Sequence, residues 1–117
     1  MDRIKIGKAG EEEACGYLKN KGYTIVAQNF RCRHGEVDIV ATQGEDLVFI
    51  EVKTRNNRNF GRPCEAVGWK KQRHIQKTAM FYLTKYGSVE MNVRFDVVEV
   101  EKEGIHHIEN AFPYQMF

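Results

Sequence analysis

The segment Gly35–Thr54, GEVDIVATQGEDLVFIEVKT, decides the fold because it has the pattern of two strands joined by a short turn. In residues 35–42, apolar and polar side chains alternate with a period of two, which is typical of a half-buried strand. Residues 47–54 are mostly β-branched or aromatic, which favours a second, more deeply buried strand. The polar residues Gln43–Asp46 between them are typical of a turn. We therefore expect an antiparallel hairpin.

The turn determines which side chains of the hairpin lie opposite one another. Gly44 at the first of two central turn positions suits a type II′ turn. With this centre, Asp38 lies opposite Glu51, and Glu36 lies opposite Lys53. Directly opposed side chains point to the same face, with Cβ atoms about 4.5–5.5 Å apart. This register brings two carboxylates together and places a lysine beside them.

Two opposed carboxylates are tolerated when a cation lies between them, because like charges directly opposite each other are destabilising and burial increases the cost. Carboxylate oxygens are ligands that Mg²⁺ and Mn²⁺ prefer. Lys53 shares the face of Glu51, where it can orient a water or stabilise developing negative charge. The pattern thus predicts a metal site with Asp38 and Glu51 as ligands. The alternative is a structural salt bridge between Glu36 and Lys53, with both acids solvated, and the hairpin alone leaves the two open.

A third carboxylate, Glu11, lies on a helix expected over residues 6–21 and ended by Gly22. At about 100° per residue, Glu11 lies within about 60° of the apolar side chains, whereas Glu12 and Glu13 turn towards solvent. A carboxylate aimed at the sheet is costly unless it is paired or metal-bound. The alternative is a favourable interaction with the helix dipole. The apolar face consists of Ile4, Ala14, Cys15 and Leu18.

The remaining periodic segments complete an α/β domain. We expect a strand over residues 23–27 and a helix over 65–86 with a break near Gly68. A fourth strand is expected over 93–100, and a short edge strand over 106–111. The order α-β-β-β-α-β-β predicts an α/β sandwich, in which helices pack on the faces of a mixed sheet.

The length and composition indicate one intracellular domain. The chain has 117 residues, of which 42% are hydrophobic and 29% charged, enough for one buried core over residues 1–117. The net charge of +2 excludes a polybasic tail but allows a local basic face. Cys15, Cys32 and Cys64 are odd in number and lack a CxxC spacing, which argues against a disulfide framework or a zinc ribbon. With no membrane-length apolar run and no signal peptide, we expect a cytoplasmic protein without membrane contact.

Basic side chains follow the predicted acidic strands and are candidates for phosphate contacts. A loop rich in arginine and asparagine comes first, and the next helix begins with further cations. As a cluster beside the acids they favour a polyanionic partner, although an ordinary solvated surface is the alternative for each residue. The candidates for nucleic-acid binding are Arg31, Arg55, Arg58, Arg62, Lys70, Lys71 and Arg73.

Other side chains have simpler expected roles. Tyr23 and Phe30 are expected to pack in the core rather than stack on bases. Arg94 and Asp96 alternate with apolar residues on a central strand, so they form either a supporting pair near the acids or a simple salt bridge.

An ordered set of short motifs extends from Gly7 to about Phe112. The motifs are Gly7-x-x-x-Glu11-x-x-Ala14-x-x-Tyr17-Leu18, Gly22-Tyr23, Asn29-x-Arg31, Gly35-Glu36-Val37-Asp38-Ile39-Val40, Val48-Phe49-Ile50-Glu51-Val52-Lys53-Thr54-Arg55, Phe60-Gly61-x-Pro63, Glu65-Ala66-Val67 and Arg94-Phe95-Asp96-Val97-Val98. This set resembles the bacterial YraN-type family of uncharacterised proteins, which is similar to archaeal Holliday-junction resolvases and to the PD-(D/E)XK nuclease-like superfamily.

The resemblance implies a restriction-endonuclease-like α-β-β-β-α-β core and a role for each matching residue. Asp38 and Glu51 match the metal-binding acids, Lys53 matches the catalytic lysine, and Glu11 matches the helix glutamate of the resolvase-like branch. Val37 stands where the superfamily usually has proline. Because resolvase-like relatives act as dimers, a homodimer is expected by analogy.

Two functions follow as hypotheses. The first is a Mg²⁺- or Mn²⁺-dependent DNA endonuclease, resolvase-like in its hydrolysis of phosphodiesters. The second is a nucleic-acid-binding or adaptor module that keeps the fold and the acids but has little or no turnover. The complete set of two acids and a lysine favours the enzyme.

Overall fold

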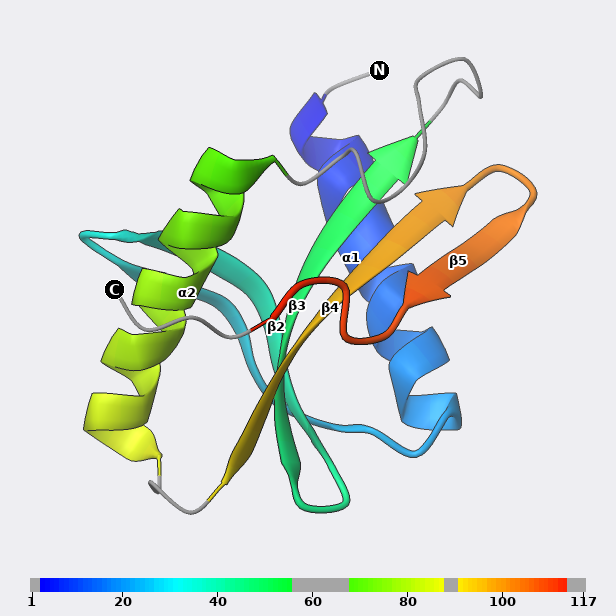
Figure 1. Ribbon diagram of the computed structural model, residues 1–117. Coiled ribbons are helices and arrows are strands. Elements are labelled where there is room, and N and C mark those ends of the chain that lie inside the picture. Colours follow the sequence, from blue (N-terminus) through cyan, green and yellow to red (C-terminus); the bar gives the residue numbers. More distant parts are fainter. Residues whose placement is uncertain (1–2, 56–67, 88–90, 114–117) are drawn as a thin grey trace.

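A computed structural model of the chain describes residues 3–55, 68–87 and 91–113. The elements follow the predicted order α-β-β-β-α-β-β (Figure 1). No helix in these described ranges is both long and apolar enough to cross a membrane. The elements are α1 Arg3–Asn20, β1 Thr24–Cys32, β2 Gly35–Gln43, β3 Asp46–Arg55, α2 Trp69–Tyr86, β4 Asn92–Glu101 and β5 Gly104–Ile108.

The strands form one five-stranded mixed sheet in the order β1-β2-β3-β4-β5. Neighbouring strands are antiparallel except β3 and β4, which are parallel. A parallel pair needs a crossover connection, and the segment containing α2 makes it. The architecture is therefore the predicted α/β core, compatible with a restriction-endonuclease-like fold.

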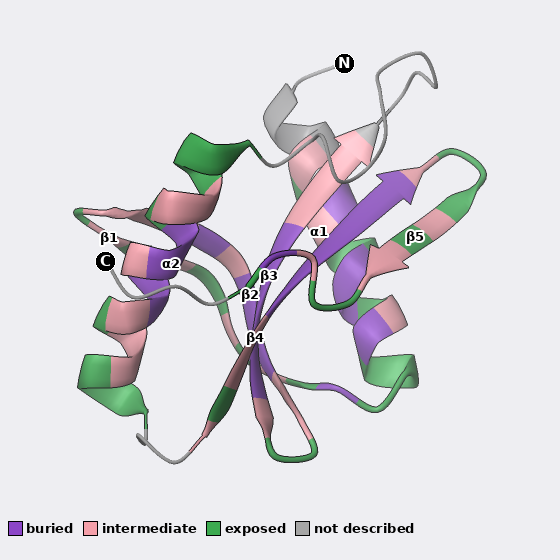
Figure 2. Ribbon diagram, in the orientation of Figure 1, coloured by how far each residue is buried: buried purple, intermediate pink, exposed green. Residues whose placement is uncertain are grey.

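Each face of the sheet is covered by one helix, so the buried residues divide into two cores (Figure 2). Along β3, Val48 and Ile50 pack on the α1 side, whereas Leu47 and Phe49 pack on the α2 side. This alternation is the period-two pattern of a strand buried on both faces. By this alternation Glu51 and Lys53 point to the α2 side.

The β2–β3 hairpin has the predicted register. The paired residues run from Gln43 opposite Asp46 to Ile39 opposite Ile50. Of the two central turn residues, only Gly44 has a positive φ, at 59°, as a type II′ turn requires. The turn therefore determines the pairing as expected.

The pairing ends earlier than predicted, because the sheet forks beyond Ile39 and Ile50. The β1–β2 hairpin turns towards α2, while β3 continues alongside α1 (Figure 1). Asp38 is therefore not the ladder partner of Glu51. Instead, its Oδ2 accepts the backbone N–H of Val52 at 2.8 Å. At the fork, the Asp38 side chain thus accepts the hydrogen bond that a backbone carbonyl would accept in a continuing ladder.

Other boundaries shift by a few residues. Helix α1 begins at Arg3 rather than residue 6, and α2 begins at Trp69 with Gly68 as its N-cap. The predicted helical residues 65–67 lie outside the described ranges. Strand β5 covers Gly104–Ile108 rather than 106–111. It ends early because Asn110 has a positive φ of 53°, which interrupts an extended strand.

Candidate functional site

The four predicted site residues gather at the fork of the sheet, one from α1, one from β2 and two from β3. The carboxyl group of Glu11 lies close enough to Asp38 and Asn29 to be affected by both: burial and the charge of Asp38 raise the pKa of Glu11, and the Asn29 side chain lowers it. On β3, Lys53 Nζ lies 3.6 Å from Glu51 Oε1. Asp38 and Glu51 influence each other's charge directly. Three acids and a lysine from separate parts of the chain therefore share one location.

Gly10 lets α1 approach the sheet closely enough to bring Glu11 there. A Cβ atom at Gly10 would lie 2.0 Å from Thr54 Oγ1, which no real contact allows. Glycine is thus required for this helix–strand approach. As predicted, Glu11 is half-buried, whereas Glu12 and Glu13 are exposed. A glycine directly before the inward-facing acid is the sequence signal for this close approach.

The two strand acids are hard to ionise together. Glu51 is only 5% exposed. Burial and the charge of Asp38 raise the pKa of Glu51 to about 7, against the opposing effect of Lys71 and Lys53. Burial also raises the pKa of Asp38, although the hydrogen bond from Val52 opposes this. An added cation would favour ionisation of both groups.

Lys71 from the first turns of α2 supplies a second cation. Its Nζ lies 3.5 Å from Glu51 Oε1. Lys71 is a candidate for phosphate binding from its sequence position, and this contact with Glu51 was not predicted. The sequence signal for this contact is that Lys71 lies four residues before Ile75, which is buried. Residues four apart lie on the same face of a helix, so Lys71 faces the sheet with Ile75.

The donor set at the fork suits a divalent metal bound through few protein ligands. Glu51 Oε2 is buried and has no hydrogen-bond partner within the described ranges. Among those same residues, no three acidic, histidine or cysteine side chains converge as a ready metal cluster. Mg²⁺ usually keeps several waters and binds through one or two carboxylates plus substrate phosphates. Asp38 and Glu51 fit that mode.

A further buried acid that the sequence analysis missed lies next to this group. Glu99 of β4 is 1% exposed and pairs in register with Lys53 on β3. Paired residues on neighbouring strands point to the same face, so Glu99 faces α2 together with Lys53 and Glu51. The signal was a glutamate at an inward position of the apolar run VVEV, residues 97–100.

The structural alternative for Lys53, a salt bridge to Glu36, is not what the structure contains. Glu36 Oε2 lies 3.3 Å from Arg31 Nε, and Lys53 contacts Glu51 instead. Arg31 keeps 74% of its side-chain surface exposed, so it is still accessible to an anion.

The other predicted phosphate contacts divide into two groups. Lys70 is exposed on the first turn of α2, and the Arg73 guanidinium lies over the ring of Trp69. Arg58 and Arg62 lie outside the described ranges, as does the side chain of Arg55.

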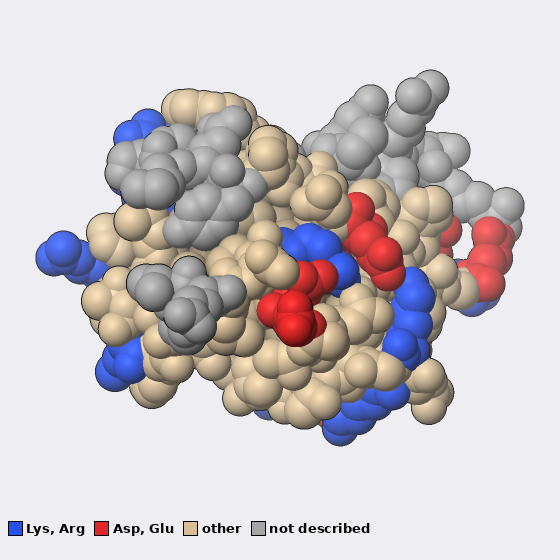
Figure 3. Space-filling view, turned by 60° about the horizontal axis from the view of Figure 1, so that its bottom comes forward, with Lys and Arg blue, Asp and Glu red and all other residues tan. Residues whose placement is uncertain are grey.

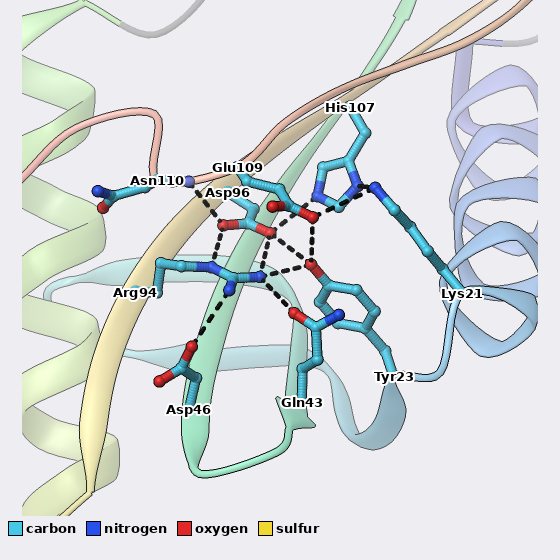
Figure 4. Close-up of polar contacts among 9 residues, drawn as sticks. All are labelled: Lys21, Tyr23, Gln43, Asp46, Arg94, Asp96, His107, Glu109 and Asn110. Carbon is cyan, nitrogen blue, oxygen red and sulfur yellow. Dashed lines mark hydrogen bonds and ion pairs between the residues drawn. The ribbon is translucent and has the colours of Figure 1, made fainter.

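A second polar cluster surrounds Asp96, in the middle of β4 (Figure 4). Asp96 accepts hydrogen bonds from Arg94, Tyr23 and the backbone N–H of Asn110, and it contacts His107 Nε2 at 2.8 Å. Burial raises the pKa of Asp96, but the hydrogen bonds outweigh it and hold the pKa at about 2.

The Asp96 side chain lies on the α1 face of the sheet, opposite to the face of Glu51, because Asp96 pairs in register with Ile50. Arg94 also reaches Asp46, the first residue of β3, at 3.2 Å. The predicted ion pair of Arg94 and Asp96 is confirmed, and buried Tyr23 packs in the core as expected.

Acidic and basic side chains intermix on the face shown in Figure 3. Such a mixed surface does not attract a polyanion strongly.

Comparison with known proteins finds one family over most of the chain. The profile described as uncharacterised protein family UPF0102 matches residues 10–100. A UPF0102 protein of Alkaliphilus oremlandii is 49% identical over 114 residues, covering 92% of this chain and 97% of the relative. A UPF0102 protein of Caldicellulosiruptor saccharolyticus is 44% identical over 118 residues, covering 96% of this chain and 100% of the relative.

Proposed function

The chain belongs to the uncharacterised protein family UPF0102, and we propose that it is a divalent-metal-dependent nuclease that hydrolyses phosphodiester bonds in DNA. Membership confirms the resemblance to YraN-type proteins. The relation of that family to Holliday-junction resolvases supports the proposal by analogy. The DNA partner, the homodimer and the cytoplasmic location are parts of this proposal.

The observation that carries the proposal is the meeting of Glu11, Asp38 and Glu51 at the fork. Carboxylates are rarely brought together and buried without a cation, because each adds a desolvation cost and mutual repulsion. The buried Oε2 of Glu51 has no partner within the described residues. It is therefore an oxygen ready to accept a ligand.

Each side chain has a distinct task in the proposed reaction. Asp38 and Glu51 would hold Mg²⁺ or Mn²⁺, which supplies Lewis-acid stabilisation of the phosphate when bound. Lys53, with 32% of its side chain exposed, can orient a water and stabilise charge on the phosphate oxygens. Glu11, whose carboxyl group lies near Asp38, would help to position Asp38 and the metal. Lys71 neutralises Glu51 until substrate phosphate offers it another partner.

A second function, nucleic-acid binding without turnover, is favoured by one specific observation. Both Lys53 and Lys71 already contact Glu51 Oε1, and no complete metal cluster exists among the described residues. An acidic site neutralised by lysines needs no metal for stability. On this alternative, the lysines are permanent partners of the acid.

The test is a cleavage assay on branched, flapped, single-stranded and duplex DNA with Mg²⁺, Mn²⁺ or chelator. We expect cleavage of at least one substrate that depends on the metal. Asp38→Asn should reduce the rate by about a hundredfold or more, because it removes a charge needed in the transition state. Glu45→Gln, an exposed turn residue of the same hairpin, is the control and should cleave normally. DNA binding without metal-dependent cleavage of any substrate would favour the second function.

A further inference from the structure

Trp69 is the most exposed large hydrophobic side chain in the described part of the chain, at 63%. It is the first residue of α2, whose first turn is exposed in Figure 2. A single exposed hydrophobic residue is ordinary by itself. What distinguishes Trp69 is its location and the side chains around it.

The first turn of α2 borders the acidic site. Lys71, two residues after Trp69, reaches Glu51 Oε1 at 3.5 Å. This turn lies at the end of the molecule where β3 and β4 terminate (Figure 1). An exposed indole and the buried carboxylate are therefore connected through one short stretch of helix.

The surroundings of Trp69 are cationic rather than apolar. The Arg73 guanidinium lies 5.6 Å from the centroid of the ring. In the segment GWKKQRH, residues 68–74, tryptophan is the only large apolar side chain, and Lys70 and Lys71 are exposed. Lysine is depleted in the cores of protein–protein interfaces, so the two lysines beside Trp69 argue against such a role. An aromatic face among cations is the arrangement that stacks a base and neutralises its phosphates.

The other exposed aromatic residues of α2 differ in this respect. Phe81 and Tyr86 pack against Phe30, with ring centroids 6.2 and 6.4 Å apart. Tyr86 also contacts Tyr82 at 5.1 Å. These rings stabilise the packing of α2 on β1. For Trp69, the ring contact within the described residues is the cation of Arg73.

We propose that Trp69 stacks on an unpaired base of the nucleic-acid strand whose backbone lies at the Asp38–Glu51 site. The inference rests on the proposed function and specifies its substrate class. In a duplex, base faces are covered by their neighbours, so a stacking side chain needs a base that is unpaired. The substrate is therefore single-stranded DNA or DNA with a locally unpaired segment. Lys70 and Lys71 hold the phosphates of that strand.

The fluorescence of the protein's tryptophan comes from Trp69 alone, because the chain contains one tryptophan, so it reports directly on binding at this residue. The intact protein is titrated with a short single-stranded oligonucleotide and, separately, with a blunt duplex of matching length, both in chelator to prevent cleavage. We expect saturable quenching of tryptophan fluorescence by the single strand. The duplex should bind about tenfold more weakly and quench less.

Three variants separate stacking from general charge attraction, measured by anisotropy of a labelled single strand. Trp69→Ala should weaken binding by about tenfold or more, and Trp69→Phe should keep most of the affinity because it keeps an aromatic face. Tyr86→Ala, an exposed aromatic at the far end of the same helix, should bind like the wild type. Melting temperatures of all variants show that each is folded.

The outcomes separate this inference from the nuclease proposal. Unchanged single-strand affinity in Trp69→Ala, unchanged fluorescence at saturation, or no binding by the wild type overturns the stacking role. A Trp69→Ala variant that changes only self-association overturns it in favour of a protein interface. If Asp38→Asn loses cleavage while Trp69→Ala binds normally, the nuclease stands without stacking. If Trp69-dependent binding occurs without metal-dependent cleavage, stacking stands and the nuclease proposal fails.

Discussion

Asp38 Oδ2 accepts a hydrogen bond from the backbone N–H of Val52 at 2.8 Å, at the point where β2 and β3 separate. The carboxylate replaces the carbonyl that a continuing strand would have offered. It therefore satisfies a main-chain donor of the same strand that carries Glu51. This contact couples the stability of the fork to the chemistry of the site.

The first prediction separates the charge of Asp38 from its role as an acceptor. Asp38→Asn keeps an oxygen for Val52 and removes the repulsion with Glu51, so the metal-free protein should be no less stable. Asp38→Ala removes the acceptor and should cost about 1–3 kcal/mol of unfolding free energy. Urea denaturation in chelator measures both. Equal, large losses in the two variants would show that the charge itself stabilises the fold.

The second prediction concerns the approach of α1 to β3. Gly10→Ala places a Cβ against Thr54 Oγ1 and should destabilise the protein by about 1–3 kcal/mol. Gly7→Ala is the matched control, because nothing lies within 4 Å of a Cβ there. It should be neutral or stabilising by up to about 1 kcal/mol. The double variant Gly10→Ala, Thr54→Ala should recover part of the loss. Identical effects at both glycines would argue against the close contact.

The third prediction concerns pH and the Asp96 cluster. The pKa of Asp96 is lowered from 3.8 to about 2, so the folded state binds its proton more weakly than the unfolded state. The resulting stability is fully present above about pH 4 and is lost as pH falls towards 2. At neutral pH, Asp96→Asn should cost about 3 kcal/mol, because it removes a buried partner of Arg94. The partly exposed Asp46→Asn should cost under about 1 kcal/mol.

Denaturation of the wild type and Asp96→Asn at several pH values checks this assignment. The difference in unfolding free energy between the two proteins should shrink below about pH 4. A difference that is constant from neutral pH to pH 2 would mean that the ionised form of Asp96 contributes nothing.

The strand pattern was enough to predict the order of elements and the hairpin register, because Gly44 and the alternation of side chains are local signals. The inward direction of Glu11 was likewise predictable from helical spacing. The early end of the β2–β3 pairing could not be predicted from the sequence, because it depends on the Asp38 side chain replacing a backbone acceptor. Asn29 has a positive φ of 52°, an irregularity in β1 that the residue pattern did not predict.

The missed site residues share one physical reason. Lys71 and Glu99 come from α2 and β4, and their positions depend on how the crossover packs on the sheet. Local periodicity shows which face a residue occupies but not which residue of another element lies opposite. Their proximity to Glu51 and Lys53 is therefore information that the tertiary structure adds.

The central claim is that Asp38 and Glu51 hold a divalent cation, and Mn²⁺ binding tests it most directly. Free Mn²⁺ is followed by electron paramagnetic resonance during titration of the wild type, Asp38→Asn and the Glu45→Gln control, with melting temperatures recorded alongside. We predict saturable binding and a raised melting temperature for the wild type and control, and little of either for Asp38→Asn. The claim is contradicted if Mn²⁺ binds all three proteins equally, or binds none and leaves every melting temperature unchanged.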